Sequence, residues 1–228
     1  MRVFSEEGQR REGGYQDMTL RIAIVGAGPA GIYAADLLLK DDKLPDVSID
    51  LFERLPAPYG LVRYGVAPDH PRIKGIVSSL REILDSGKIR LFGNVNFGTD
   101  VTLDDLKHLY HAVIFATGAM RDAVLDIPGI DLPGSFGAAD FVSWYDGHPD
   151  VPRDWPLDAK EVAIIGNGNV ALDVARMLVK RPKDLYPTEV PDNVYAALNS
   201  SQVRDVHVYG RRGPRDVKFT PLELRELG

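Results

Sequence analysis

The sequence predicts an α/β fold made of two Rossmann-like three-layer nucleotide-binding units, each incomplete at its C-terminal side. The first observation is a glycine-rich turn that occurs twice, as IAIVGAGPAGIYAADLL and again as VAIIGNGNVALDVARML. In each copy an apolar strand precedes the turn and a helix rich in small residues follows it. The second observation is that the next strands, VSIDLFE and VHVYGRR, end on side chains of opposite charge. The two units are therefore expected to bind different dinucleotides.

The first turn has the glycine spacing of a dinucleotide-binding turn, with Gly26, Gly28 and Gly31. The first glycine makes the tight turn, the second lets the backbone approach a pyrophosphate, and the third lets helix and strand pack closely. The pyrophosphate would rest on the free N–H groups at the start of the following helix. The alternative is a glycine turn that only packs a helix.

A carboxylate closes the second strand of this unit. We expect strands at residues 21–26 and 47–53 with a helix at 29–40 between them, so Glu53 ends the second strand. A carboxylate in that position accepts hydrogen bonds from ribose hydroxyls and repels a 2′-phosphate. Glu53 therefore favours FAD or NAD.

The second turn has Gly166, Gly168 and Ala171 at the corresponding positions. Its next strand arrives late, after the insertion KRPKDLYPTEVPDNVYAALNSSQ, and ends on Arg211 and Arg212. Guanidinium groups stay charged, and their donors match phosphate oxygens. The arginine pair therefore favours NADP, so that an FAD unit is followed by an NADP unit. The alternative is a solvated charge run at a strand end.

The composition is that of a globular protein. Of the 228 residues, 44% are hydrophobic and 26% are charged. No apolar run approaches the length needed to span a bilayer. The net charge of −6 argues against general affinity for nucleic acid. We therefore expect no membrane span and no nucleic-acid partner.

The chain contains no cysteine. This excludes a disulfide framework, a Cys-ligated zinc or iron–sulfur cluster, and a redox-active CxxC pair in this chain. It also excludes the thioredoxin-reductase type of chemistry, in which electrons pass to a cysteine pair. An electron carrier must come from outside, and we expect no metal site.

Three segments are predicted: a disordered tail at 1–19, an FAD-binding lobe at 20–118 and a partial NADP-binding lobe at 119–228. The tail lacks the apolar core of a secretory signal, and its acidic residues argue against a mitochondrial transit peptide. Met18 is an alternative start to Met1. We expect a cytoplasmic location.

The middle of the first lobe predicts a loop, a helix, a short capped helix and a strand. The segment LPAPYGLVRYGVAPDHP is too rich in Pro and Gly for regular structure, and long ordered loops usually carry function. The apolar spacing of RIKGIVSSLREIL predicts one helix, with His70 near its N-cap. Thr102 and Asp105 should cap a short helix, and HAVIFATG should be a buried strand that ends at Gly118.

The second lobe predicts a helix at AADFVSWYDG and a loop at VPRDWPLD before the strand that opens at residue 161. Near its end, TPLE places Thr220 at an N-cap, Pro221 at the first helical position and Glu223 three residues after the cap. This pattern is typical of a capping box.

Four motifs in order resemble the adrenodoxin-reductase-like ferredoxin–NADP⁺ reductases: GLVRYGVAPDHP, IGNGNVALDVAR, GRRGP and FTPLELRE. The resemblance runs from about residue 20 to the last residue. It implies a flavoenzyme that takes a hydride from NADPH onto FAD and passes single electrons to a ferredoxin or similar small acidic iron–sulfur protein. Related flavoproteins such as the small subunit of glutamate synthase usually bring cysteine-rich segments, which this sequence lacks.

The resemblance also implies which residues bind the cofactors. The FAD would contact Gly26, Gly28, Ala30, Gly31, Glu53, Leu61 and Val95. The NADP would contact Asn167, Gly168, Asn169, Val170, Arg211, Arg212 and, at its nicotinamide end, Glu223. His70 and Glu226 would lie together beside the flavin, where the pair would tune charge or manage a proton, because the flavin supplies the redox chemistry.

Plainer interpretations exist for these last residues. His70 could be a helix-capping loop residue, and Glu223 could serve only the capping box. Glu226 lies about one turn further on, where an exposed glutamate is ordinary.

The resemblance also fails in one respect, because the chain has about half the length of such reductases. We therefore expect a truncated chain. The competing hypothesis is an incomplete nucleotide-binding fragment, or a subunit that needs a second chain to complete the FAD site. A flavin monooxygenase also pairs FAD with NADPH, but its signature is absent.

Overall fold

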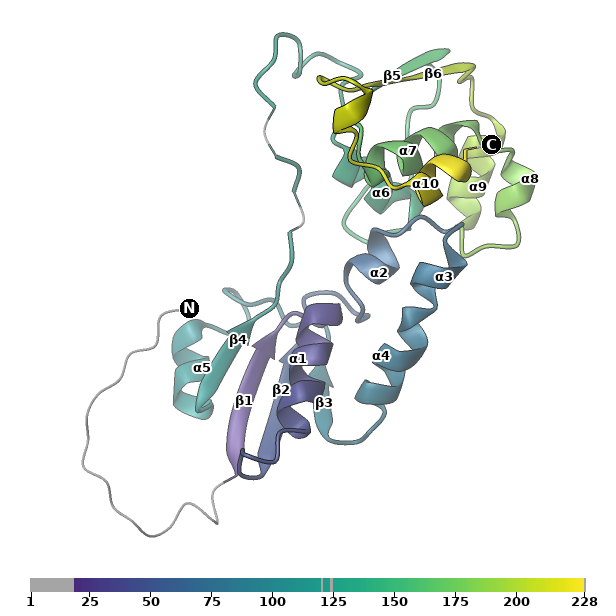
Figure 1. The fold of residues 1–228 in the computed structure, drawn as a ribbon. Helices are drawn as coiled ribbons and strands as arrows, with labels where there is room; N and C mark the ends of the chain where they lie inside the picture. Colours follow the sequence, from purple (N-terminus) through teal and green to yellow (C-terminus); the bar gives the residue numbers. More distant parts are fainter. Residues whose placement is uncertain (1–18, 120, 124, 228) are drawn as a thin grey trace. The chain divides into compact units, whose positions relative to one another are not determined.

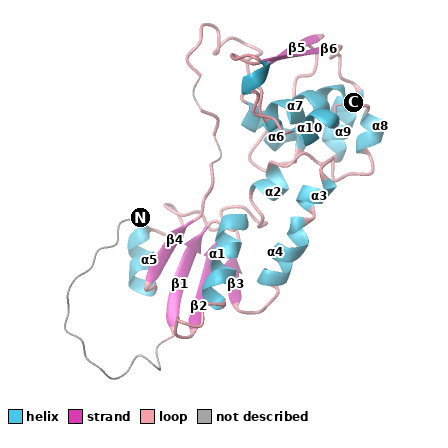
Figure 2. Ribbon diagram, viewed as in Figure 1, coloured by secondary structure: helices cyan, strands magenta, loops and turns pink. Residues whose placement is uncertain are grey.

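The computed structural model describes residues 19–119, 121–123 and 125–227 (Figures 1 and 2). The predicted tail at 1–19 therefore lies outside the described residues except for Thr19. The chain divides into two compact units, which are described separately below. The first unit comprises the residues up to 57 together with 83–116, and the second comprises 58–82 and the residues from 117 onward.

The segment 58–82 groups with the second unit, although the sequence boundaries of the two lobes placed it in the first. Ala67 is fully buried in the hydrophobic core of the second unit, and His70 contacts Asp173 in that unit. Hydrophobic and polar contacts therefore attach this segment to residues about a hundred positions later in the chain. The other break, between 116 and 117, lies close to the predicted boundary.

The first unit is built on a parallel four-stranded sheet in the order β3-β2-β1-β4. Its elements are β1 (Leu20–Val25), α1 (Pro29–Leu39), β2 (Val47–Phe52), β3 (Ile89–Phe92), α5 (Leu103–Leu109) and β4 (Ala112–Phe115). The first strand is central, since Ile22 pairs with Ile49 of β2 on one side and with Ala112 of β4 on the other. The predicted strand–helix–strand order of this unit is confirmed, with each boundary within one residue.

Helices α1 and α5 cover opposite faces of this sheet. Successive residues of a strand point to opposite faces. Ile24 of β1 lies against the start of α1, whereas Ala23 and Val25 form a buried cluster with Leu106 of α5. The sheet of the first unit is thus enclosed between two helices, as expected for a Rossmann-like fold.

The predicted cap of α5 is confirmed, but the predicted burial of the next strand is wrong. The Thr102 hydroxyl accepts a hydrogen bond from the Asp105 N–H, and the Asp105 carboxylate accepts one from the Thr102 N–H. Strand β4 ends at Phe115, three residues before the predicted end, and Phe115 is 51% exposed. The strand lies at the sheet edge, so it has a hydrogen-bonded neighbour on one side only.

The second unit combines a parallel two-stranded sheet with a larger helical layer. Its strands are β5 (Glu161–Ile165) and β6 (Asp205–Tyr209). Its helices include α6 (Ala138–Tyr145), α7 (Asn169–Val179), α8 (Pro182–Leu185), α9 (Asp192–Asn199) and α10 (Pro221–Arg225). The core forms mainly among α6 to α9, around Trp144, Met177 and Val194. The long insertion after α7 thus supplies two core helices.

The segment 58–84 contains more helix than the sequence predicts. The loop expected before His70 includes a short helix, α2 (Leu61–Tyr64). The single helix expected after it is two helices, α3 (Pro71–Lys74) and α4 (Ile76–Leu84). The break falls at Gly75, a residue type with low helix propensity. Among the described residues, no helix is both long and apolar enough to cross a membrane.

Candidate functional site

The first glycine turn is sterically tight. Gly26 has a φ of 110°, in the left-handed region that favours glycine. A Cβ atom at Gly31 would clash with the carbonyl oxygen of Gly26, so the first turn of α1 lies directly on the bend. Helix α1 begins at Pro29 after Gly28, which makes no side-chain cap. The amides in the first turn of the helix therefore have no intrahelical acceptor and can meet a phosphate.

The Glu53 carboxylate faces this turn. One oxygen accepts a hydrogen bond of 2.9 Å from the Ala27 N–H, and the other accepts one of 3.0 Å from the Leu55 N–H. The backbone N–H of Val95 donates to the carbonyl of Glu53 at 3.0 Å. An ionised carboxylate has about four acceptor positions, so the side chain keeps acceptors for ribose hydroxyls. The turn, the acid and Val95 are thus brought together in the first unit.

The second glycine turn is more open. Gly166 has a φ of 149°, and a Cβ there would make only ordinary contact with Ala171, at 3.7 Å. The helix that starts here carries Ala171 at the position that is Gly31 in the first turn. A Cβ at Gly168 would meet nothing within 4 Å, so protein packing does not require this glycine. The space in front of it fits the close backbone approach of a pyrophosphate.

The chain after β6 returns to this second turn and is attached to it. The N–H groups of Lys218 and Phe219 donate to the carbonyl of Asn167 at 3.0 and 3.1 Å, and the Thr220 N–H donates to the Asn169 side chain at 2.8 Å. The Asn167 side chain also lies so close to Gly210 that a Cβ at Gly210 would meet its amide nitrogen at 2.8 Å. The two asparagines therefore act as anchors for the segment 210–220.

This attachment places the predicted phosphate-binding arginines next to the turn. Arg211 and Arg212 directly follow Gly210, and both side chains are exposed. Val170, in the first turn of α7, is 51% exposed. Leu61 opens α2 in the second unit and is 49% exposed, so it does not belong to the unit that holds Glu53.

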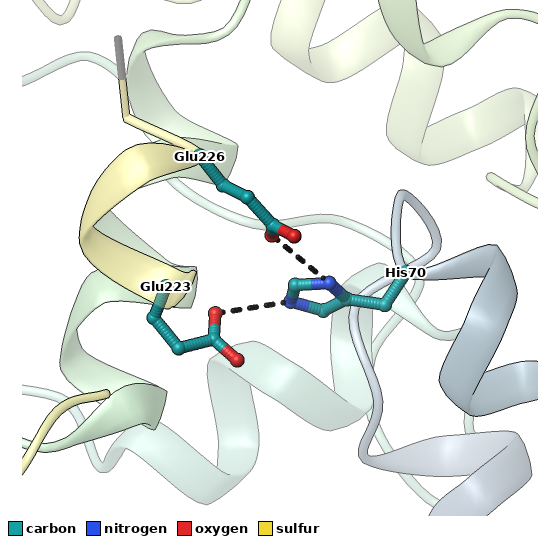
Figure 3. A group of neighbouring side chains, drawn as sticks. All are labelled: His70, Glu223 and Glu226. Atoms are coloured by element: carbon teal, nitrogen blue, oxygen red, sulfur yellow. Dashed lines mark ion pairs between the residues drawn. The ribbon is translucent and has the colours of Figure 1, made fainter. Parts of the chain in front are cut away.

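The structure brings His70, Glu223 and Glu226 together (Figure 3). The imidazole lies between Glu223 of α10 and Glu226, the C-cap of that helix, with Nδ1 at 3.1 Å from Glu226 and Nε2 at 3.4 Å from Glu223. His70 is the N-cap residue of α3 but makes no side-chain cap. The capping box of α10 is only half present, because the Thr220 hydroxyl accepts from the Glu223 N–H while the Glu223 carboxylate turns toward His70.

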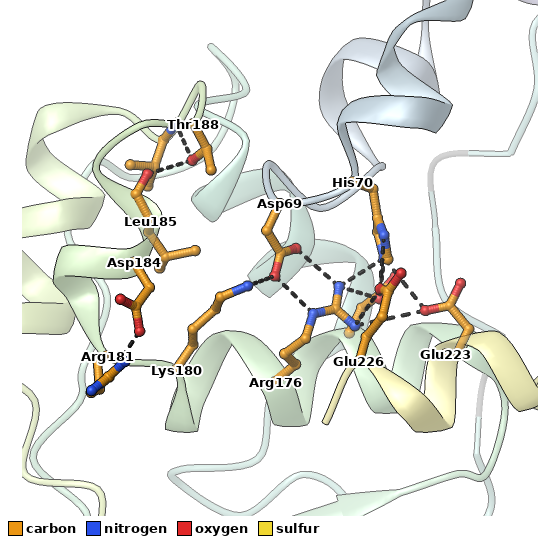
Figure 4. A network of polar contacts seen from close by, with 12 residues as sticks. Asp69, His70, Arg176, Lys180, Arg181, Asp184, Leu185, Thr188, Glu223 and Glu226 are labelled. Atoms are coloured by element: carbon orange, nitrogen blue, oxygen red, sulfur yellow. Dashed lines mark hydrogen bonds and ion pairs between the residues drawn. The ribbon is translucent and has the colours of Figure 1, made fainter. Parts of the chain in front are cut away.

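Helix α7 supplies further charged groups to this cluster, which sequence reasoning missed (Figure 4). His70 Nε2 lies 2.9 Å from an Asp173 carboxylate oxygen and 2.7 Å from an Arg176 nitrogen. Arg176 also donates two hydrogen bonds to Asp69, at 2.8 and 3.0 Å, and Lys180 donates one to the same carboxylate at 2.7 Å. The spacing of three and four residues in DVARMLVK places these groups on one helix face, which was the available signal.

The pKa values in this cluster follow from burial and charge. The hydrogen bond to Asp173 raises the pKa of His70 above its ordinary value, against the opposing effects of burial and of Arg176. Burial, and then the nearby Asp173 charge, raise the pKa of Glu223. Burial alone would raise the pKa of Asp69, but the hydrogen bonds from Arg176 and Lys180 lower it to about 2. The cluster therefore favours a proton on His70 and full ionisation of Asp69.

One histidine and two glutamates with ligand atoms within 4.8 Å resemble a metal-ligand set, but the geometry favours an ion-paired network. The two glutamates face different ring nitrogens of His70, each at ion-pair distance from its own nitrogen. Arg176 Nη1 lies 3.7 Å from each glutamate and supplies positive charge. A further cation would be repelled by this guanidinium.

The sequence pattern of the pyridine nucleotide-disulphide oxidoreductases matches residues 20–207, and the chain belongs to this family. Within the family it is a homologue of the adrenodoxin reductases and of FprA. It is 46% identical to the mitochondrial NADPH:adrenodoxin oxidoreductase of Drosophila melanogaster, over 92% of this chain and 45% of the relative. It is 47% identical to the NADPH-ferredoxin reductase FprA of Mycobacterium tuberculosis, over 90% of this chain and 46% of the relative.

A solved structure of Mycobacterium tuberculosis FprA in complex with NADPH superposes on this chain with a TM-score of 0.88 and 47% identity. The match covers 92% of this chain and 47% of the FprA chain. The Rossmann-like nucleotide-binding fold and the resemblance stated above are therefore confirmed. The chain spans about half the length of the curated relatives it matches.

Proposed function

We propose that this chain carries the two dinucleotide sites of an FAD-dependent ferredoxin–NADP⁺ reductase. The observation that carries the proposal is the pair of glycine turns, one facing a carboxylate and the other next to an exposed arginine pair. Opposite charges beside otherwise similar turns select different adenosine riboses. The relatives named as NADPH-dependent reductases of adrenodoxin and ferredoxin support this assignment.

The residues of the first unit fit FAD. The free amides of Ala30 and Gly31 would hold the pyrophosphate at the start of α1, and the Glu53 carboxylate would accept the ribose hydroxyls. Val95 would meet the cofactor through the loop backbone after β3, which is hydrogen-bonded to Glu53. When bound, FAD supplies the change from two-electron to one-electron transfer, which no side chain of this cysteine-free chain supplies.

The residues of the second unit fit NADP. Gly168 leaves open space for the pyrophosphate, and the first turn of α7, with Asn169 and Val170, offers backbone amides. Arg211 and Arg212 would bind the 2′-phosphate through charge-assisted hydrogen bonds. Glu223 would lie toward the nicotinamide, and His70 and Glu226, beside the flavin, would hold a proton and balance charge. The electron acceptor would be a small acidic iron–sulfur protein of the ferredoxin type.

The competing proposal is a nucleotide-binding fragment without turnover, or a subunit completed by a second chain. The observation that favours it is the chain's span of about half of its relatives. The cytoplasmic location also stays a prediction, since the relatives include mitochondrial adrenodoxin reductases as well as mycobacterial FprA.

Reconstitution with FAD tests these proposals. The purified chain is incubated with FAD, freed of excess cofactor, and examined by visible absorbance, and then NADPH oxidation is followed with ferricyanide or a [2Fe–2S] ferredoxin as acceptor. The reductase is supported if the chain retains one FAD per molecule, if the Glu53→Gln variant does not, and if NADPH reduces the acceptor. A flavin-binding chain without turnover supports the fragment, and a chain that retains neither nucleotide contradicts both assignments.

A further inference from the structure

Three polar atoms at His70 lie within hydrogen-bond distance of one another, but no single arrangement of protons makes all three contacts hydrogen bonds. Its corners are His70 Nε2, an Asp173 carboxylate oxygen and an Arg176 guanidinium nitrogen, and its edges are 2.9, 2.8 and 2.7 Å. Arg176 Nη2 carries two N–H groups, and one of them donates to Asp69, so the other donates either to Asp173 or to His70 Nε2. However, Nε2 can accept from Arg176 only when it carries no proton, and it can donate to Asp173 only when it does.

The neighbour of His70 Nδ1 is the same in the neutral and in the protonated form of the ring. His70 Nδ1 lies 3.1 Å from the Glu226 carboxylate, so a proton on Nδ1 is stabilised by that negative charge whether or not Nε2 is protonated. The imidazolium form then donates from Nε2 to Asp173 and keeps its Nδ1 proton beside the Glu226 carboxylate. The neutral form keeps the Nδ1 proton beside Glu226 and accepts at Nε2 from Arg176. Each protonation state of His70 therefore has a hydrogen-bond partner at Nε2 and a carboxylate beside Nδ1, without movement of the surrounding heavy atoms.

We infer that Arg176 is a positioning residue that supplies the hydrogen bond of neutral His70, while Asp173 supplies that of the protonated form. Loss of the Nε2 proton to water exchanges the hydrogen bond to Asp173 for one from Arg176, which gives Nε2 the Nη2–H that otherwise serves Asp173, and the Nδ1–H stays beside Glu226. The ring keeps one orientation through the exchange. A histidine that holds or releases a proton beside a redox cofactor needs a ring orientation that is the same in both protonation states. Only this role beside a cofactor rests on the proposed function.

Burial makes Arg176 fit for this role. Its side chain is 3% exposed, and the paired hydrogen bonds to Asp69 fix the plane of its guanidinium. The charged groups that face His70 are Asp173 and Arg176 from α7, Glu223 from α10 and Glu226 at the C-cap of α10. The acids outnumber the bases among these four, which explains why the protonated form is favoured and why a dedicated partner is needed for the neutral one.

Nitrogen NMR of the histidine side chains tests the inference on the chain without any nucleotide. The chain is labelled with ¹⁵N-histidine, the His70 signals are assigned with a His70→Gln variant, and the ring nitrogens are followed through a pH titration. We expect neutral His70 to carry its proton on Nδ1. A neutral form that carries its proton on Nε2 overturns the inference, and because this result needs no variant, it stands even if every variant unfolds.

Two substitutions should move the pKa of His70 in opposite directions. Arg176→Met removes the partner of the neutral form, so the pKa should rise by about one pH unit, and Asp173→Asn should lower it by a similar amount. Arg176→Lys keeps the charge but not the planar donor fork, so it should give a smaller rise. Lys180→Gln is the matched control, since Lys180 bonds Asp69 and not His70.

The outcomes separate this inference from the proposed function. If Arg176→Met and Asp173→Asn shift the pKa of His70 in the same direction, or Lys180→Gln shifts it as strongly as Arg176→Met, the role of Arg176 is only structural. The titration contains no flavin and no nicotinamide. A chain that fails to bind FAD can therefore still show the exchange, and a chain that binds FAD can fail to show it.

Discussion

The Arg176 guanidinium binds the Asp69 carboxylate through two hydrogen bonds, of 2.8 and 3.0 Å, across 107 positions of the sequence. Both side chains are almost completely buried, with 3% and 4% of their surfaces exposed. This ion pair joins the loop motif APDHP to the helix that follows the second glycine turn. It thereby sets the position of His70, the next residue in the loop, against α7.

Loss of this buried pair should destabilise the second unit. Asp69→Asn leaves Arg176 and Lys180 with a neutral partner, and we expect a loss of about 3 kcal/mol in the free energy of unfolding. Denaturant unfolding at pH 7 measures this loss. The control is Asp184→Asn in the exposed pair with Arg181, for which a change under about 0.5 kcal/mol is expected. Equal losses of unfolding free energy in the two variants would mean that the buried ion pair stabilises the fold no more than the exposed one.

The same pair predicts how stability falls in acid. The pKa of Asp69 is lowered to about 2 from an ordinary value of 3.8, so the unfolded chain binds the proton first as the pH drops. The stabilisation by Asp69 is therefore complete above about pH 4 and is lost between pH 4 and 2. Asp69→Asn should unfold with less pH dependence in this window, and parallel curves for the variant and the natural chain would contradict the assignment.

The two glycine turns should respond differently to an added methyl group. Gly31→Ala forces a Cβ onto the carbonyl of Gly26, so we expect a loss of about 1 to 3 kcal/mol in unfolding free energy. Gly168→Ala meets open space and should change stability by less than about 0.5 kcal/mol. The second variant should instead weaken NADPH binding if a pyrophosphate occupies that space. Thermal and denaturant unfolding compare the two, and equal destabilisation would refute the steric distinction.

A buried acid in the second unit predicts a loss of stability at high pH. The Asp146 side chain is 1% exposed and has Lys74 at 3.4 Å, and burial raises its pKa to about 8. The folded state thus holds a proton that the unfolded chain has released, and stability falls as the pH rises from about 4 to 8. Asp146→Asn needs no proton and should be more stable than the natural chain at pH 8.5, by on the order of 2 kcal/mol.

Denaturant unfolding at pH 5 and pH 8.5 checks this prediction. The natural chain should lose stability between the two conditions, and Asp146→Asn should lose much less. The opposite result, a variant less stable than the natural chain at pH 8.5, would mean that the ion pair with Lys74 outweighs the cost of burial.

The arginine pair should discriminate between nicotinamide cofactors. Each charge-assisted hydrogen bond to a 2′-phosphate contributes about 1.5 to 3 kcal/mol, so Arg211→Ala and Arg212→Ala should each weaken NADPH binding by about 10- to 150-fold. NADH binding should change little. Calorimetry or fluorescence titration with both cofactors measures the ratio. Arg215→Ala is the matched control on the same exposed segment. An equal loss of affinity for NADPH and NADH would contradict the assignment of Arg211 and Arg212 to the 2′-phosphate.

The glycine turn of the first unit and the cap of α5 are set by residues close together in the chain. The spacing of Gly26, Gly28 and Gly31 predicts the strand, turn and helix of the first unit, because the tight bend needs glycine at 26 and the close helix needs glycine at 31. The pair of Thr102 and Asp105 predicts a helix start, because capping involves only residues three apart. Both features depend on neighbours in the chain, so the sequence reports them directly.

Other features depend on distant residues and could not be found in this way. The grouping of 58–82 with the second unit depends on the burial of Ala67 and on the pairing of Asp69 with Arg176. The exposure of Phe115 depends on the position of β4 at the sheet edge, which its apolar sequence does not reveal. Sequence spacing carries no information about which side chains meet across a hundred residues.

By itself, the sequence determined the two glycine turns, the charges that close the strands beside them, and the membership of His70 and Glu226 in one motif set. Only the tertiary structure decided that Glu53 turns back onto the Ala27 amide and that Arg176 and Asp173 meet at one nitrogen of His70. The physical reason is range: turns and caps are set by backbone geometry over a few residues, whereas proton positions in a buried cluster are set by every charge that packing brings within hydrogen-bond distance.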